Sequence, residues 1–333
     1  MHASAADKLL RHYRATARTL PWRAPAGEAA PDPYRVWLSE VMLQQTTVAA
    51  VGPRFLRFVA RWPTVDALAA AADEEVLGEW AGLGYYARAR NLLACARAVA
   101  ERGGFPDTLD QLRALPGLGA YTAAAVASIA FGRDCAAIDT NVERVVARVF
   151  AITERKAIRQ AAEGWWPKGQ AGDFAQALMD LGATICRPRE PRCADCPLRT
   201  DCSGFALGTP EAFPARPLKK PRPHRFGIAW WCCRDDRLWL VRRPPEGLLG
   251  GMAALPGGEW GEAETRGNPV AVVRHGFTHF TLDLALIARA EPPPGEGWWQ
   301  PVEALAAAGL PTLYRKAVEA GLAAKQEQRR EAA

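Results

Sequence analysis

The sequence lacks any long hydrophobic run, since no stretch approaches the roughly 18 apolar residues that a membrane-spanning helix needs. The opening residues 1–20 contain no uninterrupted apolar core, which argues against a signal peptide or an anchor and favours an amphipathic helix. Without a secretion signal, the eight cysteines are expected to be thiols or metal ligands rather than disulfides. We therefore expect a cytoplasmic protein with no membrane partner.

Lysine is also scarce, because most of the 42 basic residues are arginines. Against 36 acidic residues they leave a net charge of +6. Such an excess suits a polyanionic partner whose phosphates the cations would neutralise. A merely basic soluble enzyme has the same balance, so the charge alone leaves both interpretations open.

The pattern along the 333 residues predicts two domains, with the first nearly all helical. In residues 1–202, helices are predicted over 33–45, 73–81, 86–103, 108–115, 121–131, 140–151, 155–166 and 174–186. The proline-rich, basic stretch 203–223 predicts a linker. In residues 224–333 we expect a β-hairpin around Asp235 and Asp236, an alternating strand from Phe280, and helices over 302–309 and 312–324. The expected fold is therefore an all-α domain followed by a smaller α+β domain.

Four cysteines lie close together in the loop 186–202, as Cys186, Cys193, Cys196 and Cys202. Four thiolates in so short a loop can close around one soft metal centre. A 4Fe-4S cluster takes four cysteine thiolates, whereas structural zinc usually takes two close Cys-x2-Cys pairs. Since only one such pair is present, an iron–sulfur cluster is favoured and zinc is the alternative. The other four cysteines show no spacing signal.

A Gly-x-Gly turn in LPGLGAYTA predicts a helix–turn–helix connection at Gly117 and Gly119. Glycine permits a positive φ and a close approach of the backbone, and the helix that begins at about Ala120 directs its first amides towards an anion. The turn is thus a candidate phosphate seat, although an ordinary helix connection has the same pattern. Asp139 precedes the next helix, where Thr140 and Glu143 fit a capping box.

Together, LPGLGAYTA, IDTNVERV and the four-cysteine loop resemble the helix-hairpin-helix DNA glycosylases of the endonuclease-III type, over most of residues 1–202. The resemblance implies that the turn holds a DNA phosphate and that Asp139 serves the sugar under attack. Bifunctional members carry a lysine just after the turn, where this chain has Tyr121. Without that amine no Schiff base can form, so the resemblance implies a monofunctional hydrolase that uses water.

WLSEVMLQQT, GLGYYARARN and QALMDLGATIC resemble the adenine DNA glycosylases in particular. This resemblance implies that Glu40 protonates adenine, and apolar neighbours such as Trp37 and Val41 are expected to raise the pKa of its carboxyl. Asp139 on the other side of the sugar would stabilise an oxocarbenium-like ion. The adenine must leave the duplex first, because its glycosidic bond is shielded in the base stack.

The same resemblance implies two further sets of residues. The catalytic set comprises Glu40, Asp139, Tyr121 and Asn141. The set that contacts DNA or a base comprises Trp22, Arg23, Leu43, Gln44, Gln45, Tyr85, Arg88, Gly117, Gly119, Gln176, Thr278 and His279. Relatives often have glycine where Thr140 stands, so its side chain is expected to narrow the pocket.

The second domain resembles the Nudix-like domain found behind adenine glycosylases. RLWLVRRPPEGLLGGMAALPGGEW carries the resemblance, but the following GEAETRGNPVAVV supplies no metal-binding acidic helix, so no pyrophosphohydrolase activity is expected. RHGFTHFTLDL resembles the loop by which the family senses 8-oxoguanine, with Thr278 in place of serine and with His275 and His279 nearby.

These resemblances imply a monofunctional, monomeric adenine DNA glycosylase of the cytoplasm and bacterial nucleoid, with a 4Fe-4S cluster. Its substrate would be double-stranded DNA in which adenine is mispaired with 8-oxoguanine or guanine. One alternative is a thymine or uracil mismatch glycosylase, which can also have tyrosine after the turn. The other is a DNA-binding module without catalysis, in which both carboxylates are structural.

Overall fold

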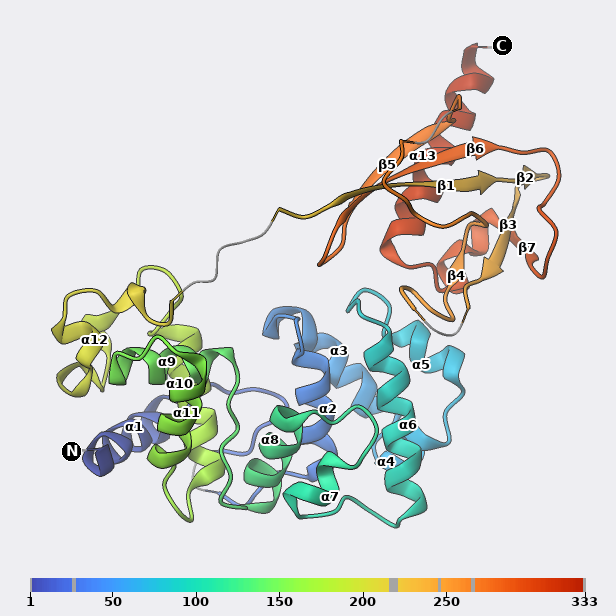
Figure 1. Ribbon diagram of the computed structural model, residues 1–333. Coiled ribbons are helices and arrows are strands. Elements are labelled where there is room, and N and C mark those ends of the chain that lie inside the picture. Colours follow the sequence, from blue (N-terminus) through green and yellow to red (C-terminus); the bar gives the residue numbers. More distant parts are fainter. Residues whose placement is uncertain (1, 26–27, 216–220, 245–246, 265–266, 332–333) are drawn as a thin grey trace. The chain divides into compact units, whose positions relative to one another are not determined.

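The computed structural model describes residues 2–25, 28–215, 221–244, 247–264 and 267–331 (Figure 1). The chain divides into two compact units, one of Met1–Ala71 and Arg90–Leu218, the other of Ala72–Ala89 and Lys219–Ala333. Among the residues that the structure describes, no helix is both long enough and apolar enough to span a membrane.

The first unit is helical, as predicted. Its helices are α1 (His2–Thr16), α2 (Pro33–Leu43), α3 (Val48–Arg61), α4 (Val65–Ala69), α6 (Ala87–Glu101, whose first turn falls in the other unit), α7 (Leu109–Arg113), α8 (Ala120–Phe131), α9 (Thr140–Phe150), α10 (Arg155–Trp165), α11 (Ala171–Thr184) and α12 (Ser203–Ala206). Short 3-10 turns lie at η1 (Cys193–Asp195), η2 (Arg199–Asp201) and η3 (Pro210–Ala212). The predicted helices of this region are confirmed to within about one turn at each end.

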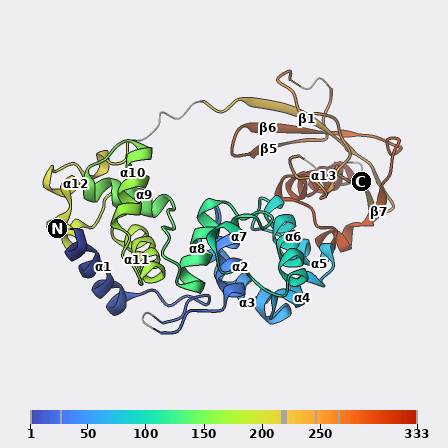
Figure 2. The ribbon, with the colours of Figure 1, turned by 60° about the horizontal axis from the view of Figure 1, so that its bottom comes forward.

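Helix α8 is central to this unit, because it packs against α2 on one side and α11 on the other (Figure 2). Its residues 122–130 are all buried, and six of these nine are alanine or serine, small enough to let neighbouring helices approach closely. Gly119 precedes it and Gly132, in the left-handed conformation, ends it. The N-terminus of α8 is thereby fixed against α2, the helix that carries Glu40.

The second unit holds α5 (Asp73–Glu79) and two small sheets. Its remaining elements are β1 (His224–Trp231), β2 (Cys233–Arg234), β3 (Arg237–Arg242), β4 (Ala253–Ala254), β5 (Ala271–Gly276), β6 (Thr281–Ala288), β7 (Trp298–Pro301), η4 (Val302–Ala308) and α13 (Thr312–Glu331). In one sheet β6 lies between β1, which is parallel to it, and antiparallel β5; in the other, β3 pairs with β2, β4 and β7. The predicted hairpin is confirmed, with Asp235 and Asp236 both at positive φ between β2 and β3.

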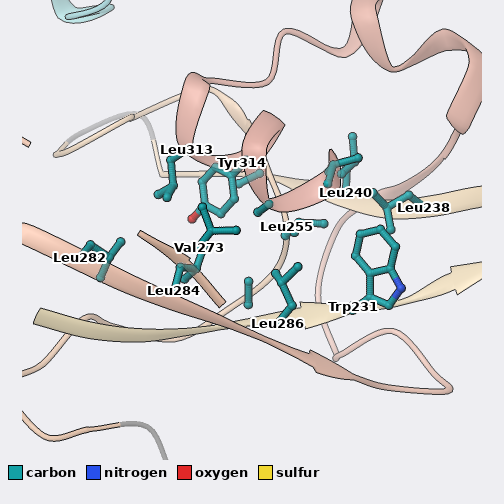
Figure 3. Packing of buried hydrophobic residues seen from close by; sticks show 14 of the residues in the cluster. Trp231, Leu238, Leu240, Leu255, Val273, Leu282, Leu284, Leu286, Leu313 and Tyr314 are labelled. Carbon is teal, nitrogen blue, oxygen red and sulfur yellow. The ribbon is translucent and has the colours of Figure 1, made fainter. Parts of the chain in front are cut away.

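Alternation along β6 builds the core of this unit. Leu282, Leu284 and Leu286 are fully buried and point towards Leu313 and Tyr314 of α13 (Figure 3). Because side chains alternate across a strand, one face of β6 faces the helix, as the sequence predicts. The α+β character of the second domain is thus confirmed.

Several elements differ from the sequence prediction, which did not include helix α4 or the strands β4, β5 and β7. Helix α3 was not expected, because Gly52 and Pro53 lie inside it. Part of the predicted linker is ordered, since α12 packs against α9 and η3 follows it, while residues 216–220 lie outside the described ranges. The helix predicted over residues 302–309 is a 3-10 helix, η4, over residues 302–308.

Candidate active site

A cavity of about 660 Å³ opens in the helical unit, where α2, α8, α11 and the start of α9 meet. Glu40 of α2 lies in its wall and is only 7% exposed. The Tyr121 hydroxyl on α8 donates a hydrogen bond of 2.7 Å to Glu40 Oε2. Burial raises the pKa of Glu40 to about 7; the Tyr121 bond and Arg23 oppose this shift, and Asp139 adds to it. A carboxyl in this state holds a proton near neutral pH and can donate it.

Asp139 lies on another wall of the same cavity, as the N-cap of α9. Its Oδ1 accepts a 2.7 Å hydrogen bond from the Val142 amide, and its Oδ2 accepts one of 2.7 Å from Asn141 Nδ2. Asn141 is held in turn by Arg144, whose Nη2 donates to its Oδ1 at 2.8 Å. The predicted capping box on Thr140 is therefore wrong: Asp139 is the N-cap, and its carboxylate accepts from the amide of Val142, the third residue of the helix.

Most residues predicted to contact the base line this cavity. They are Trp22, Arg23, Leu43, Gln44, Gln45, Gly119 and Gln176, beside Tyr121 and Asn141. Gln44 Nε2 donates to Thr122 Oγ1 at 3.1 Å, which ties the end of α2 to α8. Gln45, one residue on, is exposed and has a φ of 56°, an uncommon conformation for a residue other than glycine.

Of the two glycines in the turn, only Gly117 needs to be glycine. It has a φ of +73°, and a Cβ there would lie 2.6 Å from the Cβ of Asn91. Gly119 is the N-cap of α8 with a φ of −74°, and a Cβ added there would meet open space. The turn thus leaves the first amides of α8 open towards the cavity.

Arg88 is buried in the turn that carries Tyr85. Its Nη2 donates to the carbonyls of Leu83 and Gly84, at 3.0 and 3.3 Å. The guanidinium therefore supports this turn, and its predicted DNA contact stays a prediction. Tyr85 itself is 47% exposed and has a φ of 49°.

Thr278 and His279 are exposed in the loop between β5 and β6 of the second unit. Tyr85 belongs to this unit as well, and its hydroxyl lies 2.5 Å from Thr278 Oγ1. His275, at the end of β5, is half-buried against Phe277. None of these residues lies in the cavity that holds Glu40.

The sequence prediction missed Arg18 and Asp180, which form an ion-paired cluster at the cavity. Arg18 lines it, and Asp180 of α11 lies behind it, paired with both Arg18 and Arg23. Asp180 stands inside the motif QALMDLGATIC, but a helical aspartate without a visible partner gives no signal of its own. The partner arginines are more than 150 positions away in the chain.

The four cysteines of the loop 186–202 line one small cavity together with Arg148. Arg148 is 2% exposed, and its Nη1 lies 3.3 Å from Cys186 Sγ; its other partners are the carbonyls of Arg187, Pro188 and Phe213. Burial raises the pKa of the Cys196 thiol to about 12, and the neighbouring cysteine sulfurs contribute to this rise. Among the described residues, no three His, Cys, Asp or Glu side chains converge closely enough to hold a single metal ion.

Comparison with known proteins gives matches to both units. The family model of the "HhH-GPD superfamily base excision DNA repair protein" matches residues 38–168, and that of the "NUDIX domain" matches residues 228–320. The chain is 35% identical to an adenine DNA glycosylase of Arabidopsis thaliana, over 83% of this chain and 51% of the relative. It is 42% identical to one of Mycolicibacterium smegmatis, over 61% of this chain and 71% of the relative.

The fold of the helical unit also matches solved structures. A thermostable thymine-DNA glycosylase superposes with a TM-score of 0.56 at 30% identity, covering 62% of this chain and 97% of the other. The chain spans about half the length of the Arabidopsis relative. The predicted endonuclease-III-like helical domain and the Nudix-like second domain are thus both confirmed.

Proposed function

Because this chain belongs to the adenine DNA glycosylase family of the HhH-GPD superfamily, we propose that it removes adenine mispaired with 8-oxoguanine or guanine. It acts as a monomeric, monofunctional hydrolase on a nucleotide flipped out of the duplex, in the cytoplasm. The observation that carries this proposal is that one cavity holds two carboxyls in different surroundings. Glu40 is buried beside Tyr121, while Asp139 accepts two hydrogen bonds.

The chemistry needs both carboxyls because adenine leaves poorly as an anion. Glu40, with a pKa of about 7, donates its proton to the base as the glycosidic bond lengthens. Asp139 has both oxygens oriented by Val142 and Asn141, so its negative charge faces the oxocarbenium-like sugar. A water then attacks the sugar, with Glu40 as its base. The cavity volume of about 660 Å³ is within the range of small-ligand sites.

The absence of a lysine after the turn supports hydrolysis rather than a lyase route. Tyr121 occupies that place, and its hydroxyl is engaged with Glu40. We therefore expect borohydride to trap no covalent adduct between enzyme and DNA. Efficient trapping would contradict the monofunctional mechanism.

The donor set of the loop 186–202 fits a 4Fe-4S cluster better than a zinc ion. Structural zinc usually takes two close Cys-x2-Cys pairs, whereas this loop has one, Cys193 and Cys196. The buried Arg148 cation donates to carbonyl groups and to Cys186 Sγ rather than to a carboxylate of the described residues. The net negative charge of thiolates on a metal centre would balance the charge of this buried cation.

When bound, the cluster would be ligated by Cys186, Cys193, Cys196 and Cys202 and would cross-link this loop. The visible spectrum of the purified protein tests this, with iron and zinc measured on the same sample. Iron with a broad visible absorption is expected. Zinc without this absorption would show that the loop holds a structural zinc ion instead of a cluster.

We also propose that the loop of Thr278 and His279 reads the base opposite adenine. Both side chains are exposed between β5 and β6, and the Thr278 hydroxyl can both donate and accept a hydrogen bond. Thr278→Val should therefore lower the rate on adenine opposite 8-oxoguanine more than the rate opposite guanine. Equal losses on both duplexes would contradict this role.

Release of free base from defined duplexes tests the main proposal. Adenine should be released from pairs with 8-oxoguanine and guanine, and Glu40→Gln and Asp139→Asn should abolish the release. Because one structural match is a thymine-DNA glycosylase, a duplex with thymine opposite guanine is the decisive comparison. Thymine release without adenine release would replace the proposed substrate. If the wild type binds the duplexes but releases no base, a DNA-binding module without catalysis would remain.

A further inference from the structure

Asp180 holds together the two arginines that line the cavity. Its Oδ1 accepts from Arg18 Nε at 2.6 Å and lies 2.6 Å from Arg18 Nη2. Its Oδ2 accepts from the Arg18 amide at 3.1 Å and from Arg23 Nη1 at 2.8 Å. Asp180 is 8% exposed and does not itself line the cavity. Its carboxylate therefore acts on the site only through the two arginines.

These ion pairs place a stretch that has no helix or strand of its own. Residues 17–25 and 28–32 join α1 to α2 without regular secondary structure. Arg18 and Arg23, on either side of Pro21, are both fixed to the same carboxylate on α11. Arg35 Nη2 adds a 2.8 Å bond to the Pro21 carbonyl. The stretch that brings Arg18 and Arg23 to the cavity is thus held to α11 by a single aspartate.

Two free guanidinium ions on this wall would oppose the proposed chemistry. The adenine gains a proton and the sugar becomes cationic, so nearby positive charge raises the barrier. The groups that act on the pKa of Glu40 are the neutral Tyr121 hydroxyl of α8, Asp139 before α9 and Arg23 of the joining stretch. Without the charge of Asp180, Arg23 would favour the ionised form of Glu40 more strongly. A negative partner for the arginines therefore preserves the proton on the acid.

We propose that Asp180 is a positioning residue for base excision, which clamps Arg18 and Arg23 and cancels part of their charge at the cavity. This inference rests on the proposed glycosylase function. It assigns Asp180 a task distinct from general stability, because its loss changes the electrostatics at Glu40 as well as the packing.

Single-turnover adenine release between pH 6 and pH 9 tests the inference on the full-length protein. The rate should fall above the pKa of Glu40, where the acid loses its proton. In Asp180→Asn this alkaline limb should move to lower pH, and a shift of about one unit would cut the rate at pH 8 roughly tenfold. Asp180→Glu restores the charge and should return the limb towards its original position.

The control is Asp173→Asn, the same change two turns earlier on α11, at a residue that does not line the cavity. It should leave the pH profile unchanged. Binding to a duplex with uncleavable 2′-fluoro-deoxyadenosine separates the two roles. A positioning role predicts that Asp180→Asn retains binding within about threefold, whereas a merely structural role weakens binding and keeps the wild-type pH profile.

Arg18→Gln provides a second variant in case Asp180→Asn fails to fold. The Arg18 side chain is 29% exposed, and its removal leaves Asp180 paired with Arg23 alone. The alkaline limb should then move to higher pH. An unshifted limb in Asp180→Asn or Arg18→Gln overturns the inference, provided that the wild type releases adenine. If the wild type releases none, the proposed function itself has failed.

Discussion

Replacing Glu40 by glutamine should abolish base release and at the same time stabilise the protein at alkaline pH. The pKa of this carboxyl is raised from 4.5 to about 7 by burial. In the unfolded chain the group releases its proton near pH 4.5, whereas the folded protein keeps it until about pH 7. Folding stability is therefore lost as the pH rises between these values. The full shift corresponds to about 3 kcal/mol, at about 1.4 kcal/mol for each pKa unit.

Glutamine cannot ionise, so the variant escapes this loss. The difference in unfolding free energy between Glu40→Gln and the wild type should be small at pH 4.5 and reach about 3 kcal/mol at pH 8. Urea unfolding of the helical unit at several pH values measures it, with Glu101→Gln, an exposed residue at the end of α6, as the control. A difference that does not grow with pH, or a variant that still releases adenine, would refute the assignment of Glu40 as a buried acid.

Two further substitutions test the geometry around this acid. The 2.7 Å hydrogen bond from Tyr121 lowers the pKa of Glu40, and Tyr121→Phe removes it. A hydrogen bond to a buried charge contributes about 1.5–3 kcal/mol. The alkaline limb of the rate profile should therefore move to higher pH by roughly one to two units. A limb that moves down would contradict the contact. Gly117→Ala should cost about 1–3 kcal/mol in urea unfolding, because its φ is +73° and its Cβ would press on Asn91, whereas Gly119→Ala, with open space, should cost less. Equal costs at both glycines would show that the turn is formed differently.

Local patterns predicted most helices, and in the second domain the hairpin around Asp235 and Asp236 and the strand β6. The alternation that ends with Leu286 identified the buried face of β6, because side-chain direction in a strand follows from position alone. Local patterns failed at α3, where Gly52 and Pro53 indicate a break. Tertiary contacts override them there, since Val51, Phe55 and Phe58 on one face of the helix are fully buried.

The candidate site was also predicted in part. Glu40, Asp139 and Tyr121 were all found from motifs, and the cavity brings them together. The DNA contact predicted for Arg88 stays a prediction, and the motif match did not indicate that its side chain turns back onto the carbonyl groups of Leu83 and Gly84. Asp180 was missed because the residues that give it a role are distant in the sequence.

The sequence by itself determined which chemical groups are available: two carboxyls, a tyrosine in place of a lysine, and four clustered cysteines. Only the tertiary structure decided the state of those groups. The proton on Glu40 depends on burial and on groups brought from α8, the start of α9 and the joining stretch. The placement of Arg18 and Arg23 depends on one carboxylate of α11. Solvation and Coulomb energies depend on which groups lie close together in space, and the separation of two residues along the chain does not determine that distance.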